Sequence, residues 1–392
     1  MKTINTEKIP IYLWLDDIDD NALVQAKNLA NLPFAYHHIA IMPDAHEGYG
    51  MPIGGILAAI DYVVPNAVGV DIGCGMCAIK SDIKNTDKTI LKKIMSAMRE
   101  QIPLGFEHHK ESQQEKWMPE MQEAINRDSY KIVKQEYKSA LKQIGTLGGG
   151  NHFIEIQRGS DGYVWFMVHS GSRNIGKKVA DHYNRLAVSL DERTGLKIPK
   201  EWELAALPVK SEEGKNYLQE MQYCVDFALA NRELMIERIK KIIQGQFREK
   251  VNFEEPINIA HNYAAKELHF DKMVYVHRKG ATLATKDTIG IVPGSQGSKS
   301  YIVRGRGNPD SYNSCSHGAG RVMSRGQARR ELDLKKEIKK LDDLGIIHAL
   351  RGISDLEEAS SAYKSISKVM ENQKDLVEIL VELTPLAVVK GT

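Results

Sequence analysis

The spacing of apolar and polar residues along the chain predicts both helices and strands. Apolar residues recur at helical spacing over residues 16–31, 86–102, 111–125, 129–144, 174–189, 217–246 and 355–383. Continuous apolar runs next to glycine, proline or charged residues predict strands over residues 36–42, 56–64, 77–83, 163–168 and 273–277. We therefore expect an α+β fold with mixed and antiparallel sheets at the centre and helices outside.

Several of the predicted strands carry a histidine at an end that is flanked by glycine. The Asp161-Gly162 pair between two apolar runs predicts a β-hairpin, whose strands carry His152 and His169. The run that ends at His277 enters a glycine-bearing loop in the same way. A lone histidine in such a place is more often structural, so these residues are informative only as a set.

The segment AVGVDIGCGM, residues 67–76, places Asp71 and Cys74 three residues apart on a glycine-rich turn. Thiolate and imidazole ligands favour Mn, Fe, Co or Zn, and a carboxylate beside them leaves harder ions open. Asp-x-x-Cys alone would favour a buried structural cysteine. The two hairpin histidines reverse that preference and indicate a metal site.

Two other segments supply candidates without a ligand pattern. In MPDAHEGYGMPIGG, residues 42–55, prolines and glycines argue against regular structure. His46 in this loop is a candidate ligand or substrate contact, with a plain surface histidine as the alternative. The mostly helical section 197–270 is expected to pack against the rest of the protein, and its candidate site residues are His261 and Asn262.

Composition narrows the class of protein. The length of 392 residues allows one large domain or two to three ordinary ones, and no low-complexity linker separates the halves. The 53 basic and 51 acidic residues give a net charge of +2, so any polyanion site must be local. Four scattered cysteines and the lack of a signal sequence or long apolar span predict a cytoplasmic protein without membrane contact. Cys74 and Cys77 form a C-x-x-C, but no second pair or thioredoxin-like context supports a zinc ribbon or redox site.

Glycine-rich segments with nearby cations indicate where phosphate groups could bind. GSRNIGKK at residues 171–178 imitates a P-loop, but Lys178 replaces the Ser or Thr that would hold Mg²⁺. Only Arg173 is retained from it, as a phosphate contact at a helix start. The later loop IVPGSQGSKSYIVRGRGNP combines backbone amides with cations, which suits a polyphosphate. It presents Ser295, Ser298, Lys299, Arg304 and Arg306.

The segment SCSHGAGRVMSRGQARR sets His317 before two glycines and repeats arginine. On a helix that begins near Gly318, Arg321 and Arg325 would share one face. The alternative is a solvated basic helix face. Close to the end of the chain, a short apolar run that carries Lys390 predicts an edge strand.

A series of motifs extends over nearly the whole chain. The motifs are MPDAHEGYGMPIGG, GVDIGCGM, LGGGNHFIEI, VHSGSRNIG, VHRKGA, PGSQGSKSYIVRG, HGAGRVMSR and VVKG. In order and in local sequence they resemble those of the RtcB family of RNA-splicing ligases. The resemblance implies an RtcB-like fold in one catalytic domain over residues 1–392. It also implies a ligase that uses GTP and two Mn²⁺ ions to join an RNA 3′-phosphate or 2′,3′-cyclic phosphate to a 5′-hydroxyl, through a guanylylated histidine.

The resemblance assigns metal ligands to the candidate residues. Cys74 would bridge the two Mn²⁺ ions. Asp71 and His152 would complete the first metal site. His169 and His277 would complete the second.

The resemblance also assigns residues to the nucleotide and the reaction. His317 would be the nucleophile that takes GMP, and Lys390 would contact the guanine. Arg321 is expected to contact a phosphate at the reacting centre. The nucleotide pocket would be lined by Asn151, Phe153, Glu155, Ser295, Ala319 and Gly320.

The chain departs from the family pattern in ways that leave its RNA open. Asn174 and Gln296 replace an expected glycine and methionine, and the loop between His277 and His317 is brief. A shorter ligase could serve RNA repair and not tRNA splicing. We expect a monomer, and a requirement for an activating partner, such as archease or a release-factor-like protein, is open.

Two other classes of protein fit part of the pattern. A binuclear metallohydrolase that acts on phosphoesters would use the same Asp, Cys and His ligands, but it leaves His317 without a role. A non-enzymatic RNA-binding protein would explain the arginine clusters but not Cys74 and the histidines. Sheet-borne aromatic motifs for single-stranded RNA are not apparent in the sequence.

Overall fold

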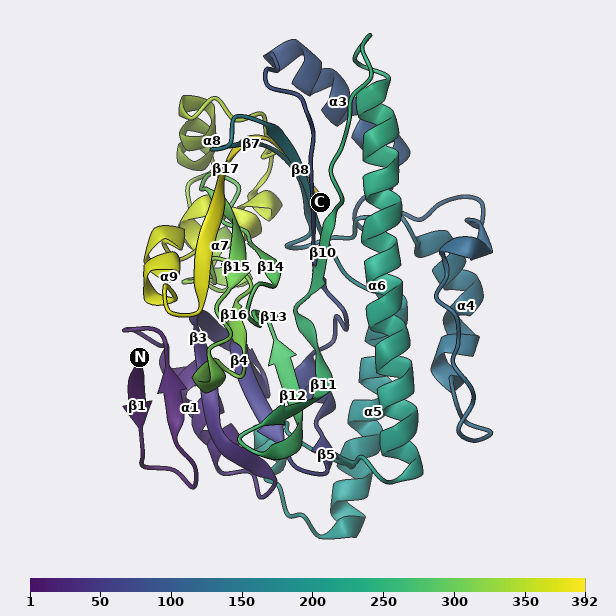
Figure 1. Ribbon diagram of the computed structural model, residues 1–392, viewed down its shortest axis with the longest axis vertical. Helices are drawn as coiled ribbons and strands as arrows, with labels where there is room; N and C mark the ends of the chain where they lie inside the picture. Colours follow the sequence, from purple (N-terminus) through teal and green to yellow (C-terminus); the bar gives the residue numbers. More distant parts are fainter. Residues whose placement is uncertain (392) are drawn as a thin grey trace.

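Two large β-sheets form the centre of the protein (Figure 1). We describe residues 1–391 of a computed structural model, apart from the side chains of residues 192–194. The six-stranded sheet has the order β1 (Lys2–Ile4), β2 (Ile11–Leu13), β3 (Ala35–Tyr49), β4 (Met51–Ala59), β12 (Lys272–Lys279) and β11 (Asn262–His269). The seven-stranded sheet has the order β10 (Ile257–Ala260), β6 (Gly75–Lys80), β8 (Val164–Ser170), β7 (Phe153–Gly159), β17 (Val377–Lys390), β15 (Ser300–Gly305) and β14 (Ile289–Val292). Two small sheets pair β13 (Ala281–Leu283) with β16 (Ser314–Ser316) and β5 (Tyr62–Val63) with β9 (Leu207–Pro208).

Helices cover the outside of these sheets, which confirms the expected α+β fold. The α-helices are α1 (Asp20–Ala30), α2 (Pro65–Val68), α3 (Lys88–Gln101), α4 (Lys131–Gln143), α5 (Arg173–Thr194), α6 (Glu212–Gln244), α7 (Arg325–Glu331), α8 (Leu334–Asp343) and α9 (Ile366–Asn372). The 3₁₀ turns are η1 (Glu115–Trp117), η2 (Lys200–Trp202), η3 (Pro309–Ser311), η4 (Ile353–Glu358) and η5 (Ser360–Ala362). Within the described part of the chain, no helix is both long and apolar enough to cross a membrane.

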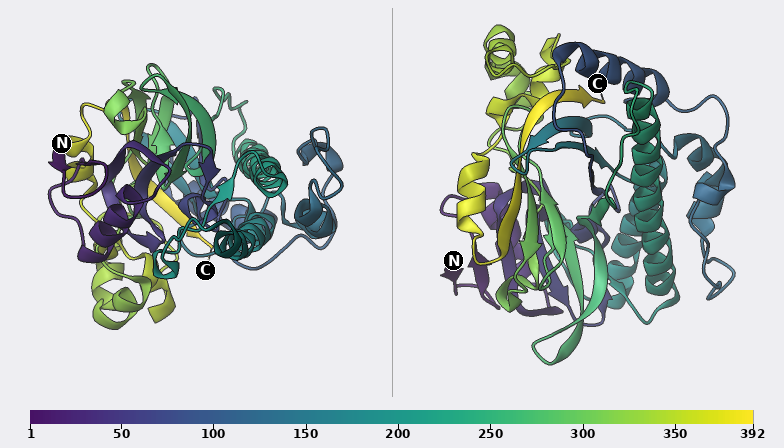
Figure 2. Two further views of the ribbon diagram at one scale, coloured as in Figure 1. Left: turned by 90° about the horizontal axis from the view of Figure 1, so that it is seen from below. Right: turned by 45° about the horizontal axis from the view of Figure 1, so that its top comes forward.

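The long helix α6 stands beside the sheets, α5 lies along its lower half, and α4 lies outside both (Figures 1 and 2). Its start is defined by Ser211, whose side chain accepts a hydrogen bond from the Gly214 amide. Tyr217 and Phe227 from its first half belong to a core shared with α4 and α5, whereas Ile239 from its second half packs with α3 and the seven-stranded sheet. Helix α6 therefore joins two cores, because it is apolar on more than one face.

The hairpin predicted at Asp161-Gly162 is present as β7 and β8. Phe153 is paired with His169 across the hairpin, and His169 is paired with Met76 of β6 on its other side. This register brings the ends of three strands together. The loop before β7, the end of β8 and the turn before β6 carry the residues predicted to bind metal.

Three predictions about regular structure are wrong. Residues 111–125 contain only the short turn η1, because the segment includes Pro119 and few of its side chains are buried. Residues 355–383 form η4, η5, α9 and the start of β17 in place of a helix. The loop at residues 42–55 continues β3 and β4 as a hairpin with register shifts, in which His46 is paired with Ile53.

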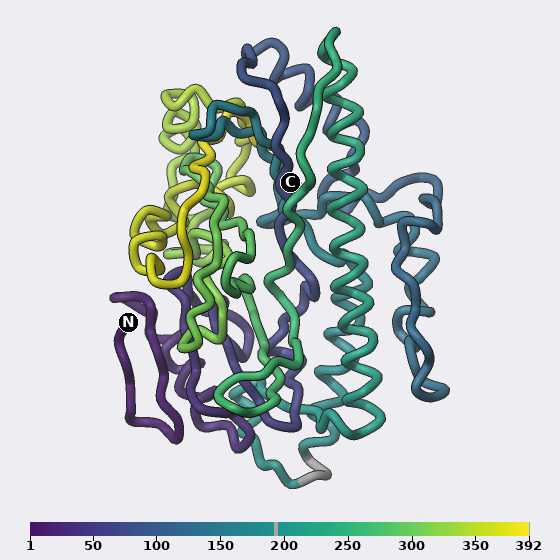
Figure 3. The backbone as a smooth tube through the Cα atoms, viewed as in Figure 1, coloured from purple at the N-terminus to yellow at the C-terminus, as the bar shows by residue number. Residues whose placement is uncertain are grey.

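The end of the chain is a central strand and not the predicted edge strand. Strand β17 is paired with β7 on one side and β15 on the other, so that Lys390 lies opposite Phe153. In Figure 3 the N-terminus lies at the rim of the molecule. The pairing of β17 on both sides places Lys390 in the interior, beside the residues that precede β7.

Candidate active site

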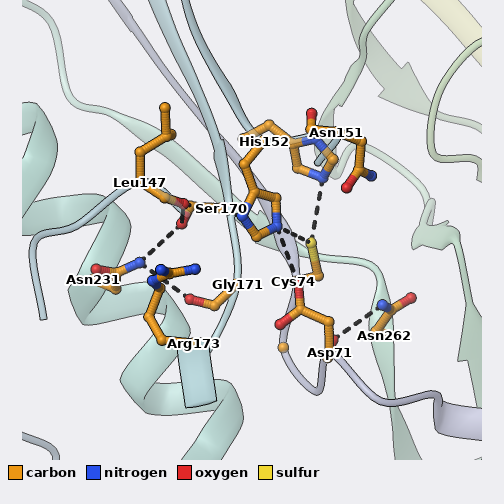
Figure 4. A network of polar contacts seen from close by, with 12 residues as sticks. Asp71, Cys74, Leu147, Asn151, His152, Ser170, Gly171, Arg173, Asn231 and Asn262 are labelled. Carbon is orange, nitrogen blue, oxygen red and sulfur yellow. Dashed lines mark hydrogen bonds and ion pairs between the residues drawn. The ribbon is translucent and has the colours of Figure 1, made fainter. Parts of the chain in front are cut away.

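Cys74, His152 and His169 form a buried cluster whose ligand atoms all lie within 4.8 Å of one another. The Cys74 Sγ lies 3.5 Å from Nε2 of His152 and 3.3 Å from Nε2 of His169. Asp71 adds a carboxylate oxygen 3.1 Å from Nε2 of His152, and the Asn262 side chain donates to the Asp71 carbonyl (Figure 4). The structure therefore brings together Asp71 with the three residues of the cluster, as the sequence predicted.

The imidazoles of the cluster are held with one nitrogen facing Cys74. Nδ1 of His152 donates to the Leu147 carbonyl at 3.0 Å, and Nδ1 of His169 donates to the Asn151 carbonyl at 3.2 Å. Because carbonyl oxygens only accept, each Nδ1 carries a proton, and Nε2 is the nitrogen that each ring turns toward Cys74. This backbone support orients both rings as metal ligands are oriented in known sites.

The electrostatics of the cluster also suit a cation. Burial raises the pKa of the Cys74 thiol well above its ordinary value, and the Asp71 carboxylate adds to this effect. Burial also lowers the pKa of His169 well below its ordinary value, with His152 contributing, so the ring is neutral. A thiol, two imidazoles and a carboxylate form a donor set that fits a divalent transition-metal ion.

His277 does not belong to this cluster, which corrects the sequence-based ligand set. Its Nε2 accepts a hydrogen bond from the Val64 amide at 2.9 Å. Its Nδ1 lies 3.2 Å from the Leu57 carbonyl and 3.1 Å from the Tyr275 carbonyl. Strand β12 belongs to the six-stranded sheet, so both ring nitrogens of His277 are taken up by backbone groups there.

His261, at the junction of β10 and β11, lies next to His169 of the cluster and to His317. Its ring centroid lies 5.2 Å from that of His169 and 4.7 Å from that of His317. Its Nδ1 is buried without a hydrogen-bond partner in the described part of the chain, and its amide donates to the Cys74 carbonyl at 2.8 Å. An unpaired buried nitrogen beside a Cys/His cluster is a further candidate ligand.

His317 is anchored by Asp44, a residue that the sequence analysis passed over in favour of His46. Asp44 Oδ2 lies 2.6 Å from Nδ1 of His317 and also accepts from the amides of His317 and Gly318. Burial raises the pKa of Asp44, but the contact with His317 more than offsets burial and leaves that pKa below its ordinary value. An ionised Asp44 keeps the proton on Nδ1, so Nε2 of His317 retains a free lone pair.

A cavity of about 860 Å³ opens next to these histidines, large enough for a nucleotide-sized ligand. Every residue predicted for the nucleotide pocket lines this cavity, and so do both predicted catalytic residues. Its lining includes Asn151, Phe153, Glu155, His169, Ser295, His317, Ala319, Gly320, Arg321 and Lys390.

Glu155 and Lys390 form the buried polar end of this cavity. Burial raises the pKa of Glu155 to about 8, although Lys390 and Gln157 act in the opposite direction. Burial also lowers the pKa of Lys390, whose Nζ lies 5.2 Å from the centre of the Phe153 ring and 3.7 Å from Glu358. A carboxyl group, an amine and an aromatic face thus converge on one place.

The predicted cations of the Ser295 loop do not point into the cavity. Lys299 forms an ion pair with Glu382, and Arg304 forms one with Glu378. Ser295 itself lines the cavity, and its amide donates to the Ser298 hydroxyl. The loop therefore contributes Ser295 to the site, while its lysine and arginine belong to the sheet surface.

Arg321 precedes the helix on which the sequence placed it. Ser324 caps α7, which begins at Arg325, and Gly320 has a φ of +73° that an ordinary helix would not allow. The Arg321 guanidinium donates to backbone and side-chain acceptors, and these are Met323, Glu357, Glu358 and Tyr363. Arg321 and Arg325 therefore do not share a helix face, although both line the cavity.

A search of family models decides which family these residues belong to. The model described as tRNA-splicing ligase RtcB matches residues 25–391 of the chain. The chain belongs to the RtcB family. It is 36% identical to RNA-splicing ligase RtcB of Escherichia coli K12, over 99% of both chains, and equally similar to RNA-splicing ligase RtcB1 of another E. coli strain. It is 30% identical to tRNA-splicing ligase RtcB of Aeropyrum pernix, over 98% of this chain and 95% of the relative.

In this member of the RtcB family, Arg173 joins two loops near the cluster. Its Nε donates to the Thr146 hydroxyl and its Nη2 to the Gly105 carbonyl, each at 3.0 Å. A Cβ on Gly148 would lie only 2.1 Å from its Nη1, so that position requires glycine. Arg173, which the sequence predicted as a phosphate contact, thus lies against the glycine-rich loop that leads to His152.

Asn231 of α6 joins two of the loops that surround the cluster (Figure 4). Its side-chain oxygen accepts from the amides of Gly145 and Thr146 at 2.7 and 3.1 Å. Its side-chain nitrogen donates to the Ser170 hydroxyl and the Gly171 carbonyl at 3.0 and 3.1 Å. Helix α6, for which the sequence predicted only a packing role, therefore also holds the loops that precede His152 and follow His169.

Arg232, the next residue of α6, is fully buried and joins the other two sides of the cluster. Its Nη1 donates to the Gly73 carbonyl at 2.9 Å and to the Ser170 carbonyl at 2.8 Å. These carbonyls belong to the immediate neighbours of Cys74 and His169. Arg232 thus fixes the separation of two candidate ligands that come from different strands.

Proposed function

We propose that this protein is a GTP-dependent RNA ligase that joins a 3′-phosphate or 2′,3′-cyclic phosphate end to a 5′-hydroxyl end. The observation that carries the proposal is the position of His317. Its Nδ1 is bonded to buried Asp44, and its ring faces a nucleotide-sized cavity between the Cys74 cluster and Glu155. The printed names of the relatives, RNA-splicing ligase and tRNA-splicing ligase, support the same class of reaction.

In the first step, Nε2 of His317 attacks the α-phosphorus of GTP. A nitrogen–phosphorus bond forms, the bond to the β-phosphate oxygen breaks, and pyrophosphate leaves with the electron pair. The Asp44 carboxylate balances the positive charge that develops on the imidazole ring. Asp44 is thus a positioning residue that fixes both the tautomer and the direction of the ring.

In the second step, an oxygen of the RNA 3′-phosphate attacks the phosphorus of the bound GMP. A 2′,3′-cyclic phosphate end must first add water, which breaks its P–O2′ bond and leaves a 2′-hydroxyl and the 3′-phosphate. The nitrogen–phosphorus bond breaks, and His317 regains its free lone pair. The 5′-hydroxyl of the other RNA end then attacks the activated 3′-phosphate, and GMP leaves as the phosphodiester forms. His317 therefore returns to its starting state after each joining event.

The donor set around Cys74 fits two Mn²⁺ ions. We propose Cys74, Asp71, His152 and His169 as ligands, with His261 in the place first given to His277. When bound, the ions would offset negative charge that develops on phosphoryl oxygens. Arg232 and Asn231 keep the ligand-bearing loops in place, whether or not metal is present.

Glu155 and Lys390 support a preference for guanine. The N1–H and N2–H groups of guanine are donors, and an ionised Glu155 can accept both, whereas adenine offers no such pair. Phe153 supplies an aromatic face next to Lys390. Asn151, Ser295, Ala319 and Gly320 line the rest of the pocket.

Arg321 is proposed to contact a phosphate at the reacting centre. Its internal hydrogen bonds use Nε, both protons of Nη1 and one proton of Nη2. One N–H group therefore remains for a ligand in the cavity. The rest of the guanidinium is held rigid by Glu358 and Tyr363.

The wider setting is also a proposal. We propose that residues 1–392 act as one catalytic domain, as a monomer in the cytoplasm. The RNA would come from tRNA splicing or from repair of cleaved RNA. Addition of archease or a release-factor-like protein to the purified ligase, followed by measurement of turnover, tests whether an activating partner is needed.

The reaction is tested with pairs of short RNAs of defined ends. With Mn²⁺ and GTP, the pair with a 3′-phosphate and a 5′-hydroxyl should be joined, and with ATP it should not. A pair with a 3′-hydroxyl and a 5′-phosphate is the matched control and should stay unjoined. Removal of the 3′-phosphate without joining would favour a metallohydrolase, and binding without any reaction would favour an RNA-binding protein.

A further inference from the structure

Phe106 is an aromatic side chain held fully in solvent beside the candidate active site. Its side chain is 99% exposed, whereas the next most exposed large apolar residue in the described chain, Leu268, is 66% exposed. Single exposed apolar residues are common on protein surfaces. Exposure alone therefore carries no function, and the surroundings of Phe106 must be considered.

Phe106 lies on a turn in which the residues before and after it make backbone hydrogen bonds. The Gly105 amide donates to the Gly148 carbonyl at 3.1 Å, and the Glu107 amide donates to the Leu104 carbonyl at 3.0 Å. Gly105 has a φ of +57°, which favours glycine. The ring is thus presented to solvent by fixed backbone.

The same turn lies against the loop that leads to His152. A Cβ on Gly149 would lie 3.7 Å from the Gly105 Cα, and the Gly105 carbonyl accepts from Arg173. At the other end of this loop, a Cβ on Gly150 would lie 2.8 Å from the guanidinium of Arg325. Phe106 therefore stands on a turn that packs against the glycine loop leading to His152. In that loop Gly148 is buried, Gly149 lies against Gly391, and Gly149 and Gly150 are partly exposed.

We propose that Phe106 is a stacking platform for an unpaired RNA base next to the end that reacts. The inference rests on the proposed function, which brings an RNA end to His317. The turn packs against the loop that carries His152, the partly exposed Gly149 and Gly150 place no side chain there, and Arg173 provides a cation next to the turn. A phenylalanine ring has no polar atom, so it accepts the face of any base and does not select sequence.

Stacking is tested with single-stranded RNA that ends in a 3′-phosphate and carries 2-aminopurine at successive positions from that end. Stacking on Phe106 should quench 2-aminopurine at one of the first positions when the wild-type protein binds. Phe106→Ala should remove this quenching and weaken RNA binding by about 5- to 150-fold, the range for loss of one stacked base. Phe106→Trp should restore both, and Phe106→Leu should not, since leucine keeps apolar bulk without a ring.

Matched controls separate stacking from loss of structure or charge. Leu268→Ala removes an exposed apolar side chain at the end of β11 and should leave RNA binding at the wild-type level. The melting temperature of Phe106→Ala should equal that of the wild type, because the ring makes no buried contact. The salt dependence of RNA affinity should also keep its slope, since no phosphate contact is lost.

If Phe106→Ala keeps the quenching and RNA affinity of the wild type, the inference is overturned. It is also overturned if Phe106→Leu restores both as well as Phe106→Trp does, because the ring would then act only as an apolar contact. The proposed function has its own readout, which is the GMP adduct and joined RNA formed by the wild-type protein. If these products form while the substitutions at Phe106 leave RNA affinity unchanged, only the stacking inference fails. If the wild type forms neither, the proposed function fails and the stacking inference fails with it.

Discussion

Asp44 and His317 lie 273 residues apart in the sequence and 2.6 Å apart in the structure, joined from Oδ2 to Nδ1. Asp44 comes from the middle of β3, and His317 follows directly after β16. The same carboxylate oxygen accepts two backbone amides, so neither its position nor that of the ring is free. The contact leaves Nε2 of His317 as the only ring nitrogen with an available lone pair.

Replacement of Asp44 by asparagine tests the role of its charge. Asp44→Asn keeps the size of the side chain and an oxygen that can accept from His317. It removes the negative charge that offsets the imidazolium formed during attack on GTP. We expect GMP-adduct formation to slow by on the order of 10²–10⁴, as for other groups that assist a nucleophile. Rapid-quench measurement of adduct formation at saturating GTP checks this, and a rate within a few-fold of wild type would refute the role of Asp44.

The exchange of His277 for His261 in the ligand set is tested by metal content. His261→Ala should weaken Mn²⁺ binding by about tenfold or more, because a ligand beside Cys74 is lost. His277→Ala should keep Mn²⁺ binding but lose roughly 1–3 kcal/mol of stability, because the buried Val64 amide loses its acceptor. Metal titration and urea denaturation of both variants measure these effects. The reverse pattern of metal loss would restore His277 as the ligand.

The raised pKa of Glu155 makes guanine binding depend on pH. With a pKa of about 8 in the free protein, the carboxyl is mostly protonated at pH 6 and half ionised at pH 8. If the ionised form alone accepts from guanine, affinity should rise about 50-fold from pH 6 to pH 8 and then level off. Guanosine is the ligand to use, since it has no phosphate to titrate. Glu155→Gln should bind guanosine more weakly, and its affinity should not depend on pH over this range. If its affinity depends on pH as much as that of the wild type, another group is responsible for the titration.

The same pKa predicts an effect on folding stability with a definite sign. The folded protein retains a proton on Glu155 that the unfolded chain releases near pH 4.5, so stability should fall as pH rises from about 4.5 to 8. Glu155→Gln cannot ionise and should show a shallower fall over that range. Urea denaturation of both proteins at several pH values measures the difference. A slope that Glu155→Gln does not change would show that this carboxyl is ionised throughout.

The hydrogen bonds of Asn231 predict a large stability cost on the buried side of α6. Asn231→Ala leaves the Gly145 and Thr146 amides buried without an acceptor, which should cost roughly 2–4 kcal/mol. Gln222→Ala, on the exposed face of the same helix, is the control and should change stability by less than about 0.5 kcal/mol. Denaturant titration of both variants gives the comparison. Similar small effects for both would mean that Asn231 does not hold these loops.

Local signals in the sequence predicted the elements that are set by short-range chemistry. The Asp161-Gly162 turn indicated the β7–β8 hairpin, and with it the approach of His152 to His169. Helical spacing indicated α6 as a continuous helix. The strand that carries Lys390 was predicted at an edge. Its central place as β17 depends on pairing with both β7 and β15, and neither partner is near it in sequence.

His261 and His277, which we propose to exchange in the ligand set, show what local pattern cannot supply. His277 shares with His169 the pattern of an apolar strand that enters a glycine-bearing loop, but its strand is paired with β4 in the other sheet. His261 is brought to Cys74 because β10 is paired with β6, with Ala260 opposite Gly75. Sheet membership is a long-range property, so residue spacing alone could not separate the two.

The central claim, that His317 is the residue that takes GMP, is tested most directly by intact mass. We would incubate three proteins with Mn²⁺ and either GTP or ATP: the wild type, His317→Ala and His182→Ala. The intact mass of each protein is then measured by mass spectrometry. His182 lies on α5 outside the cavity lining and serves as the control histidine. The wild type and His182→Ala should each gain one GMP from GTP and nothing from ATP, while His317→Ala gains nothing yet still binds Mn²⁺. A GMP adduct on His317→Ala, or none on the wild type, would contradict the account.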